Sequence, residues 1–134
     1  MTAPLTVLVV DDEPAIRRAL DRALKRWGHG VHLATSGEAA IEILTDHPVD
    51  LVVMDLRMPG MSGQTLFHSI AARWPQLVER VIVMTGDLEA EDHFDWLKQH
   101  DLPVLMKPFE LKQLETLLGA MAERRHGRSQ GDSA

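Results

Sequence analysis

Two apolar runs of the sequence lead directly into aspartates, and these carboxylates are the first sign of a reactive site. One run ends at Asp11 and Asp12, and the run 49–54 ends at Asp55. Short apolar runs of this kind are typical of buried strands. In open parallel sheets the carboxyl ends of the strands form the edge at which ligands bind. The sequence therefore predicts that three carboxylates meet at one edge of a sheet.

Two later runs end in polar groups of other kinds. Thr85 follows the run 81–84, and Lys107 follows the short run 104–106. Because the strands of a parallel sheet all point the same way, these residues are expected at the same edge as the carboxylates. The predicted site therefore also contains a hydroxyl and an ammonium group.

Each of these residues also has a purely structural explanation. Asp12 could cap a helix, and Asp55 could begin a turn. Thr85 could simply end a β-branched strand, and Lys107 could be a solvated charge. A shared function is favoured because four separate strands end in this way.

The combination of groups predicts phosphoryl transfer. Carboxylates that crowd together repel one another, which raises a pKa or requires a cation. A hard divalent ion such as Mg²⁺ takes oxygen ligands and keeps several waters. Bound Mg²⁺ attracts phosphate oxygens, while Lys107 adds positive charge and Thr85 offers a hydroxyl donor. Positioning and charge neutralisation around a carboxylate nucleophile are the main requirements of this chemistry.

The elements that must position these residues alternate along the chain. Apolar, β-branched runs predict strands at 5–10, 31–34, 49–54, 81–84 and 104–106. Apolar residues at helical spacing lie between and after them and predict helices over 14–28, 36–47, 64–74, 88–100 and 111–121.

Strands that are apolar on both faces predict a parallel sheet covered by helices on each side. With right-handed crossovers, five strands and five helices form a doubly wound α/β fold, a three-layer sandwich. We expect a single domain over residues 1–126 and a disordered C-terminal tail at 127–134.

Composition narrows the class of protein. The chain has 134 residues, 45% of them apolar, and a formal charge of −6. It contains no cysteine, which excludes disulfides and thiolate metal sites. Binding to nucleic acid requires clustered cations, and only the stretch 123–128 is locally basic. No run is long and apolar enough to span a membrane. We therefore expect a cytoplasmic protein that contacts neither nucleic acid nor membrane directly.

The chain resembles the receiver domain of two-component response regulators, and the resemblance covers about residues 5–125. It is carried by an ordered set of residues: Asp11-Asp12, Asp55 in the segment MDLRMPGMSG, Thr85-Gly86 and Lys107-Pro108-Phe109. The resemblance implies a flavodoxin-like receiver fold. It also implies that Asp55 accepts a phosphoryl group from the phosphohistidine of a sensor kinase.

The same resemblance assigns the metal ligands. Asp12, Asp55 and the backbone carbonyl of Arg57 would hold Mg²⁺, and Asp11 would act mainly through bound water. Mg²⁺ is therefore the expected cofactor.

The resemblance also assigns roles to Lys107 and Thr85, which follow the last two predicted strands. Lys107 would pair with the phosphoryl group, and its peptide bond to Pro108 is expected to be cis, as only X–Pro bonds readily are. Thr85 would move toward the phosphate to report its arrival.

One position departs from the family pattern. The residue three before Lys107 is often aromatic in this family, but here it is Val104, and the chain contains no tyrosine. A ring that turns inward behind the threonine is therefore ruled out. We expect the movement of Thr85 to be read through the loop 86–92 and the helix after it.

The leading hypothesis is a signalling phosphoacceptor of a phosphorelay, with no output domain in this chain. It is expected to be no enzyme in the usual sense, although self-phosphorylation from small donors and autodephosphorylation are expected. Its partners would be a sensor histidine kinase or phosphotransfer protein and a downstream protein target. It would be a monomer or a homodimer linked to phosphorylation. The kinase, the target and the signal cannot be read from the residues.

Several alternatives stay open. The run 102–109 resembles receivers attached to hybrid histidine kinases, although Met1 leaves little room for a linker before the first strand. A receiver cut from a regulator with a separate output domain is equally compatible. A Mg²⁺-dependent aspartyl-phosphate phosphatase would carry a carboxylate where Arg57 stands. A nucleotide or flavin carrier would need a Gly- or Ser/Thr-rich loop after the first strand. A docking module independent of phosphorylation would not need the acidic pair.

Two smaller expectations concern aromatic side chains. All seven histidines are expected at the surface. Trp96 either packs at the edge of the core or forms a partner contact.

Overall fold

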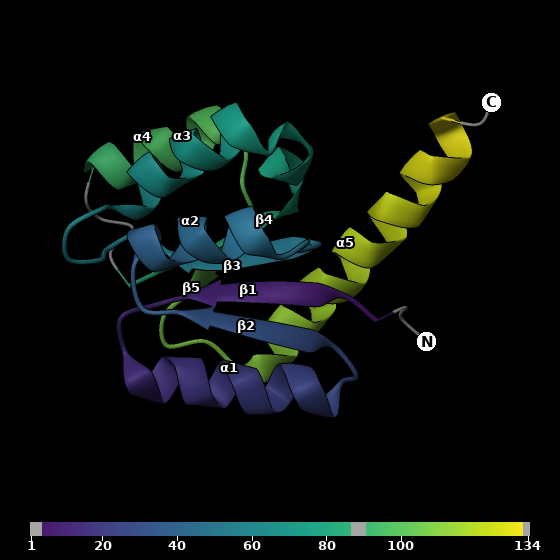
Figure 1. Ribbon diagram of the computed structural model, residues 1–134, viewed down its shortest axis with the longest axis horizontal. Coiled ribbons are helices and arrows are strands. Elements are labelled where there is room, and N and C mark those ends of the chain that lie inside the picture. Colours follow the sequence, from purple (N-terminus) through teal and green to yellow (C-terminus); the bar gives the residue numbers. More distant parts are fainter. Residues whose placement is uncertain (1–3, 87–90, 133–134) are drawn as a thin grey trace.

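A five-stranded parallel sheet forms the middle layer of the molecule (Figure 1). The computed structural model describes residues 4–86 and 91–132. The strands pair in the order β2-β1-β3-β4-β5, and every pairing is parallel. In chain order they are β1 (Thr6–Val10), β2 (Gly30–Ala34), β3 (Leu51–Asp55), β4 (Val81–Thr85) and β5 (Val104–Met106). The predicted sheet is confirmed.

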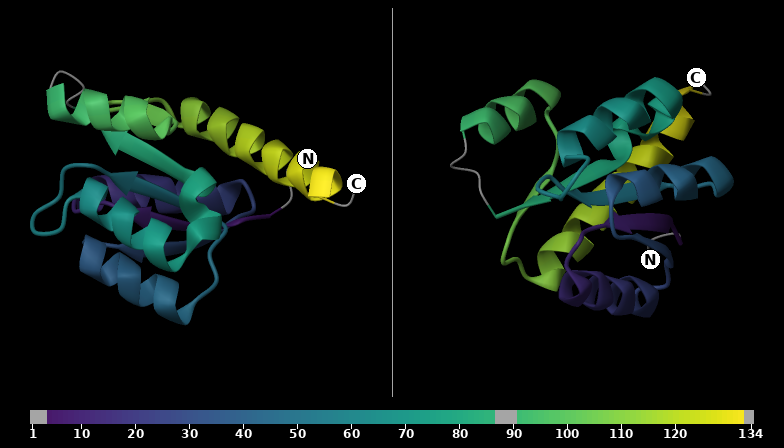
Figure 2. Two further views of the ribbon diagram at one scale, coloured as in Figure 1. Left: turned by 90° about the horizontal axis from the view of Figure 1, so that it is seen from above. Right: turned by 60° about the vertical axis from the view of Figure 1, so that its left-hand side comes forward.

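Helices cover both faces of this sheet (Figures 1 and 2). α1 and α5 pack on one face, and α2, α3 and α4 pack on the other, which gives the predicted three-layer sandwich. A short 3-10 helix, η1 (Pro75–Arg80), that the sequence pattern did not predict leads into β4. The α-helices are α1 (Pro14–Arg26), α2 (Gly37–Asp46), α3 (Gly63–Arg73), α4 (Glu91–His100) and α5 (Leu111–Asp132).

The core explains why the strands read as unbroken apolar runs. Alternate residues of a strand point to opposite faces. In β1, Val7 and Val9 pack toward α1 and α5, whereas Leu8 and Val10 pack toward α2 and α3. All four are fully buried. Because both faces are covered, neither face needs polar residues, and polar residues are left for the strand ends.

The end of the chain differs from the prediction. A disordered tail was expected from residue 127, but α5 continues to Asp132. No proline follows Leu111, and Glu, Arg and Gln favour helix in this stretch, while single glycines lower that preference without ending the helix. Residues 133 and 134 lie outside the described part. The domain boundary at residue 126 stays a prediction.

The expectation that all histidines are exposed is wrong for His29. This residue is only 7% exposed, and its Nδ1 accepts a hydrogen bond of 3.0 Å from the backbone N–H of Leu5. Burial lowers the pKa of its imidazole. The imidazole of His29 thus accepts the hydrogen bond from the N–H of Leu5 that a neighbouring strand would otherwise accept.

Trp96 packs against α3, as its structural explanation expected. It is half-buried, and its ring lies 5.3 Å from that of Phe67 and 4.7 Å from that of His100, measured between centroids. These ring contacts join α4 to α3.

Candidate functional site

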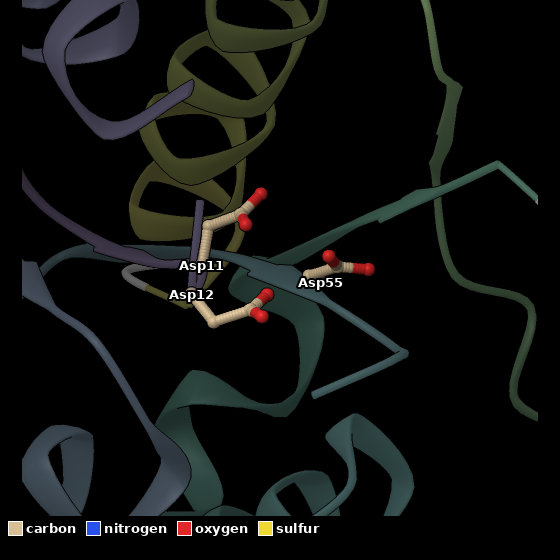
Figure 3. A group of neighbouring side chains, drawn as sticks. All are labelled: Asp11, Asp12 and Asp55. Atoms are coloured by element: carbon tan, nitrogen blue, oxygen red, sulfur yellow. The ribbon is translucent and has the colours of Figure 1, made fainter. Parts of the chain in front are cut away.

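Three carboxylates meet at the carboxyl ends of β1 and β3 (Figure 3). β1 and β3 are neighbours in the sheet, so Asp11 and Asp12 lie directly beside Asp55. One carboxylate oxygen from each residue lies within 4.8 Å of the other two. Asp11 and Asp55 are buried, and Asp12 is exposed. Three oxygen ligands of this kind fit a hard divalent cation such as Mg²⁺.

Asp11 is fixed by contacts on every side. Its Oδ1 accepts the backbone N–H of Glu13 at 2.9 Å, and its Oδ2 accepts Lys107 Nζ at 2.8 Å. Its backbone carbonyl accepts Arg17 Nη1 at 2.7 Å. Burial raises the pKa of Asp11 and outweighs the hydrogen bonds from Lys107 and Glu13, which lower it. Asp11 is therefore held in place as a buried carboxylate that gains from a nearby positive charge.

Asp55 is held by both of its oxygens. Its Oδ1 accepts the backbone N–H of Arg57 at 3.1 Å, and its Oδ2 accepts Lys107 Nζ at 2.8 Å. It is the last residue of β3 and is 5% exposed. A short side chain in this position has little freedom to turn away from the edge of the sheet.

Lys107 connects the site across the sheet. Its ammonium group contacts Asp11 and Asp55, each at 2.8 Å, and Glu13 Oε1 at 3.5 Å. Burial opposes the charged form, but the hydrogen bonds to Asp11 and Asp55 outweigh it and raise the pKa of Lys107. Its backbone N–H donates to the carbonyl of Thr85 at 2.8 Å. The peptide bond between Lys107 and Pro108 is cis, which confirms the prediction.

An open cleft of about 550 Å³ lies over these groups. Thr85 is 1% exposed and contributes to its wall. The cleft is large enough for a phosphoryl group together with a hydrated ion. Its lining residues are Asp12, Glu13, Asp55, Arg57, Met58, Pro59, Thr85, Gly86 and Lys107.

The structure brings together every residue that the sequence assigned to the site. Arg57 lines the cleft, and its backbone N–H contacts Asp55, while a metal contact from its carbonyl stays a prediction. The loop expected to read the movement of Thr85 lies largely outside the described residues, which exclude 87–90.

Two contacts of the site were not foreseen. Glu13 reaches the ammonium group of Lys107, and Arg17 holds the carbonyl of Asp11. Their positions in the sequence could have indicated both contacts. Glu13 directly follows the acidic pair, and Arg17 lies one helical turn after Glu13, so both face the end of β1.

Comparisons with known proteins agree with this geometry. The family model described as "Response regulator receiver domain" matches residues 7–119. The chain is 39% identical over 132 residues to "Sensor kinase CckA" of Brucella abortus, covering 92% of this chain and 13% of that protein. It is 33% identical over 118 residues to "Regulatory protein AtoC" of Escherichia coli, covering 88% of this chain and 25% of that protein. The chain thus spans only a minor part of either relative.

Among solved structures, the chain is similar to the response regulator protein TrrA from Thermotoga maritima in complex with Mg(2+)-BeF. The TM-score is 0.75 at 27% sequence identity, and the alignment covers 87% of this chain and 98% of that one.

Proposed function

Because this chain belongs to the response regulator receiver domain family, we propose that Asp55 is the phosphoacceptor of a two-component phosphorelay. The observation that carries the proposal is the contact of Lys107 Nζ with Asp55 Oδ2 at 2.8 Å, on the floor of a cleft that Asp12 also lines. A carboxylate nucleophile, a fixed cation and adjacent metal-type ligands are what transfer to a carboxylate requires.

In the proposed reaction a carboxylate oxygen of Asp55 forms a bond to phosphorus while the phosphorus–nitrogen bond of a phosphohistidine breaks. The electron pair leaves with the imidazole. Lys107 would offset the charge of the phosphoryl oxygens, and the hydroxyl of Thr85, which lines the cleft, would donate to one of them. The N–H of Arg57 holds the other oxygen of Asp55 in place.

Asp11, Asp12 and Asp55 would hold Mg²⁺, together with the carbonyl of Arg57. When bound, the ion would neutralise charge on the transferred group. The three clustered carboxylates support this assignment, and the Mg(2+)-BeF complex of TrrA makes the same kind of ligand a reasonable probe here.

The proposed partners are a sensor histidine kinase or a phosphotransfer protein, and a downstream protein that recognises the phosphorylated form. Similarity to a sensor kinase and to a regulatory protein supports both a hybrid-kinase receiver and a regulator with an output domain. No helix in the described ranges is long and apolar enough to cross a membrane.

A phosphatase is the weaker candidate. Such an enzyme needs a carboxyl group as general acid two residues after its aspartyl phosphate, and that position is Arg57, which has no carboxyl group. Steady release of phosphate from small phosphate esters would instead support the phosphatase.

The decisive test is labelling by acetyl phosphate with Mg²⁺, read by intact-protein mass spectrometry. The wild-type chain and Asp46→Asn, which removes an exposed carboxylate from the end of α2, should both gain one phosphoryl group. Asp55→Asn should gain none and should keep its circular dichroism spectrum. Equal labelling of Asp55→Asn would contradict the assignment of the phosphoacceptor.

A further inference from the structure

Glu13 adds a carboxylate to the cleft that neither the phosphoacceptor role nor the metal ligands explain. Its Oε1 lies 3.5 Å from Lys107 Nζ, and its side chain is 58% exposed. It lines the same cleft as Asp12 and Asp55. Glu13 therefore stands at the mouth of the site, between the solvent and the ammonium group.

The Glu13 side chain does not cap the helix that it precedes. Glu13 occupies the N-cap of α1, where short polar side chains are favoured because they accept hydrogen bonds from the first turn. The side chain of Glu13 makes no such bond. Its backbone is nevertheless fixed, because its N–H donates to Asp11 Oδ1 at 2.9 Å and its carbonyl accepts from Arg17 N–H at 3.1 Å. Its backbone is thus fixed at the edge of the cleft, and its carboxylate lies in the cleft near Lys107.

Charge at the mouth of the cleft affects anions that enter it. Within the described part of the chain, four carboxylates and two cations line the cleft or contact its lysine, which leaves a formal charge of −2: Asp11, Asp12, Glu13, Asp55, Arg57 and Lys107. Glu13 and Asp12 are the exposed carboxylates of this group. Glu13 is the one that also competes for Lys107, the cation that an incoming phosphoryl group needs.

From these contacts we infer that Glu13 is a specificity-determining residue that selects against small, highly charged phosphodonors. The inference rests on the proposed function of Asp55. A free anion must pass Glu13 and displace its carboxylate from Lys107. A donor presented by a protein surface brings its own cations and can offset this repulsion. With acetyl phosphate, an oxygen of Asp55 bonds to phosphorus while the bond from phosphorus to the acetyl oxygen breaks, and acetate leaves with the electron pair.

The test compares two small donors that differ in charge. Acetyl phosphate is close to doubly charged at neutral pH, whereas the ammonium group of phosphoramidate offsets part of its charge. Labelling rates with Mg²⁺ are measured at low and high ionic strength for wild type, Glu13→Gln and Glu13→Asp. Glu42→Gln is the matched control, because it removes an exposed glutamate from α2, outside the cleft. Thermal unfolding of each variant checks that the fold is unchanged.

Glu13→Gln should be labelled by acetyl phosphate about three to ten times faster than wild type at low salt, the size of effect expected for one nearby charge. The gain should be smaller with phosphoramidate and should shrink at high salt. Glu13→Asp and Glu42→Gln should behave like wild type.

An equal rate for Glu13→Gln and wild type with acetyl phosphate would overturn the inference. A gain that is the same for both donors and at both salt concentrations would also overturn it, because a repositioned Lys107 rather than anion repulsion would then be the cause. In both cases the wild type is still labelled. Absence of labelling in the wild type would instead remove the proposed function itself.

Discussion

At the scale of single residues, the site concentrates negative charge that the half-buried ammonium group of Lys107 only partly balances. Lys107 pairs with both Asp11 and Asp55, whereas Asp12 has no hydrogen bond or ion pair within the ranges that the structure describes. Carboxylates within a few ångströms of one another repel. The arrangement is therefore expected to favour binding of a cation at a cost to the stability of the free protein.

Substitution of Asp12 tests this balance. Asp12→Asn should raise the free energy of unfolding by a few tenths to about 1 kcal/mol without Mg²⁺, because it relieves repulsion at a partly solvated site. Wild type should be stabilised by added Mg²⁺ through mass action, and the variant much less. Urea unfolding with and without Mg²⁺ measures both effects. A variant that is less stable than wild type without the ion would show that Asp12 is structurally required.

At the scale of elements, the loop after Asp55 is fixed by the close approach of α3. A Cβ atom added to Gly63, the first residue of α3, would lie 2.6 Å from the carbonyl oxygen of Asp55 and 2.6 Å from Cα of Leu56. Both are backbone atoms, so neither can move aside without displacing the end of β3. α3 and the end of β3 are therefore held close together at this glycine.

Gly63→Ala should destabilise the protein by about 1–3 kcal/mol, because backbone must shift to admit the methyl group. It should also slow labelling of Asp55. Gly119→Ala is the matched control: it lies within α5, its added Cβ meets nothing within 4 Å, and alanine favours helix, so it should stabilise by about 0.5–1 kcal/mol. Denaturant unfolding of the two variants should give opposite signs, and equal effects would contradict the steric explanation.

The sequence predicted the sheet and the clustering of the site residues, but not every contact within the site. Runs such as the one that ends at Asp55 predicted the strands, their parallel pairing and the gathering of Asp11, Asp55, Thr85 and Lys107, because strand direction alone determines which ends meet. Spacing could not show that Lys107 also pairs with Asp11, since that contact depends on side-chain reach across 96 residues of sequence. Burial of His29 likewise depends on a backbone group that only the folded chain brings near.

At the scale of the whole molecule, His29 should make global stability depend on pH. Its pKa is lowered in the folded protein, so its contribution to stability is present above about 6.5, the ordinary value for histidine, and is lost as the pH falls through the lowered folded value. Asp11 has the opposite sign: its raised pKa gives a contribution that is present below 3.8 and lost as the pH rises through the folded value. Protonation of His29 should therefore lower the free energy of unfolding as the pH falls from 7 to 5.

His29→Gln tests this dependence, because a Gln carbonyl oxygen can accept the N–H of Leu5 without titrating. The variant should show a smaller loss of unfolding free energy between pH 7 and pH 5 than wild type. His47→Gln, which removes an exposed imidazole, should keep the wild-type slope. Urea titrations at several pH values provide the measurement, and equal slopes for wild type and His29→Gln would show that another group is responsible.

The reach of Lys107 has a mechanical consequence. It begins on the turn after β5, the edge strand, and ends on the aspartates of β1 and β3, so its ion pairs span β4 and tie together strands that are not neighbours. These ion pairs link the carboxyl ends of β5, β3 and β1 through electrostatic attraction. A phosphoryl mimic on Asp55 that draws the ammonium group away from Asp11 removes the link between β5 and β1 and keeps the one to β3. Amides of β5, an edge strand, should then exchange with deuterium faster, while amides of β1, which pairs with β2 and β3, should not.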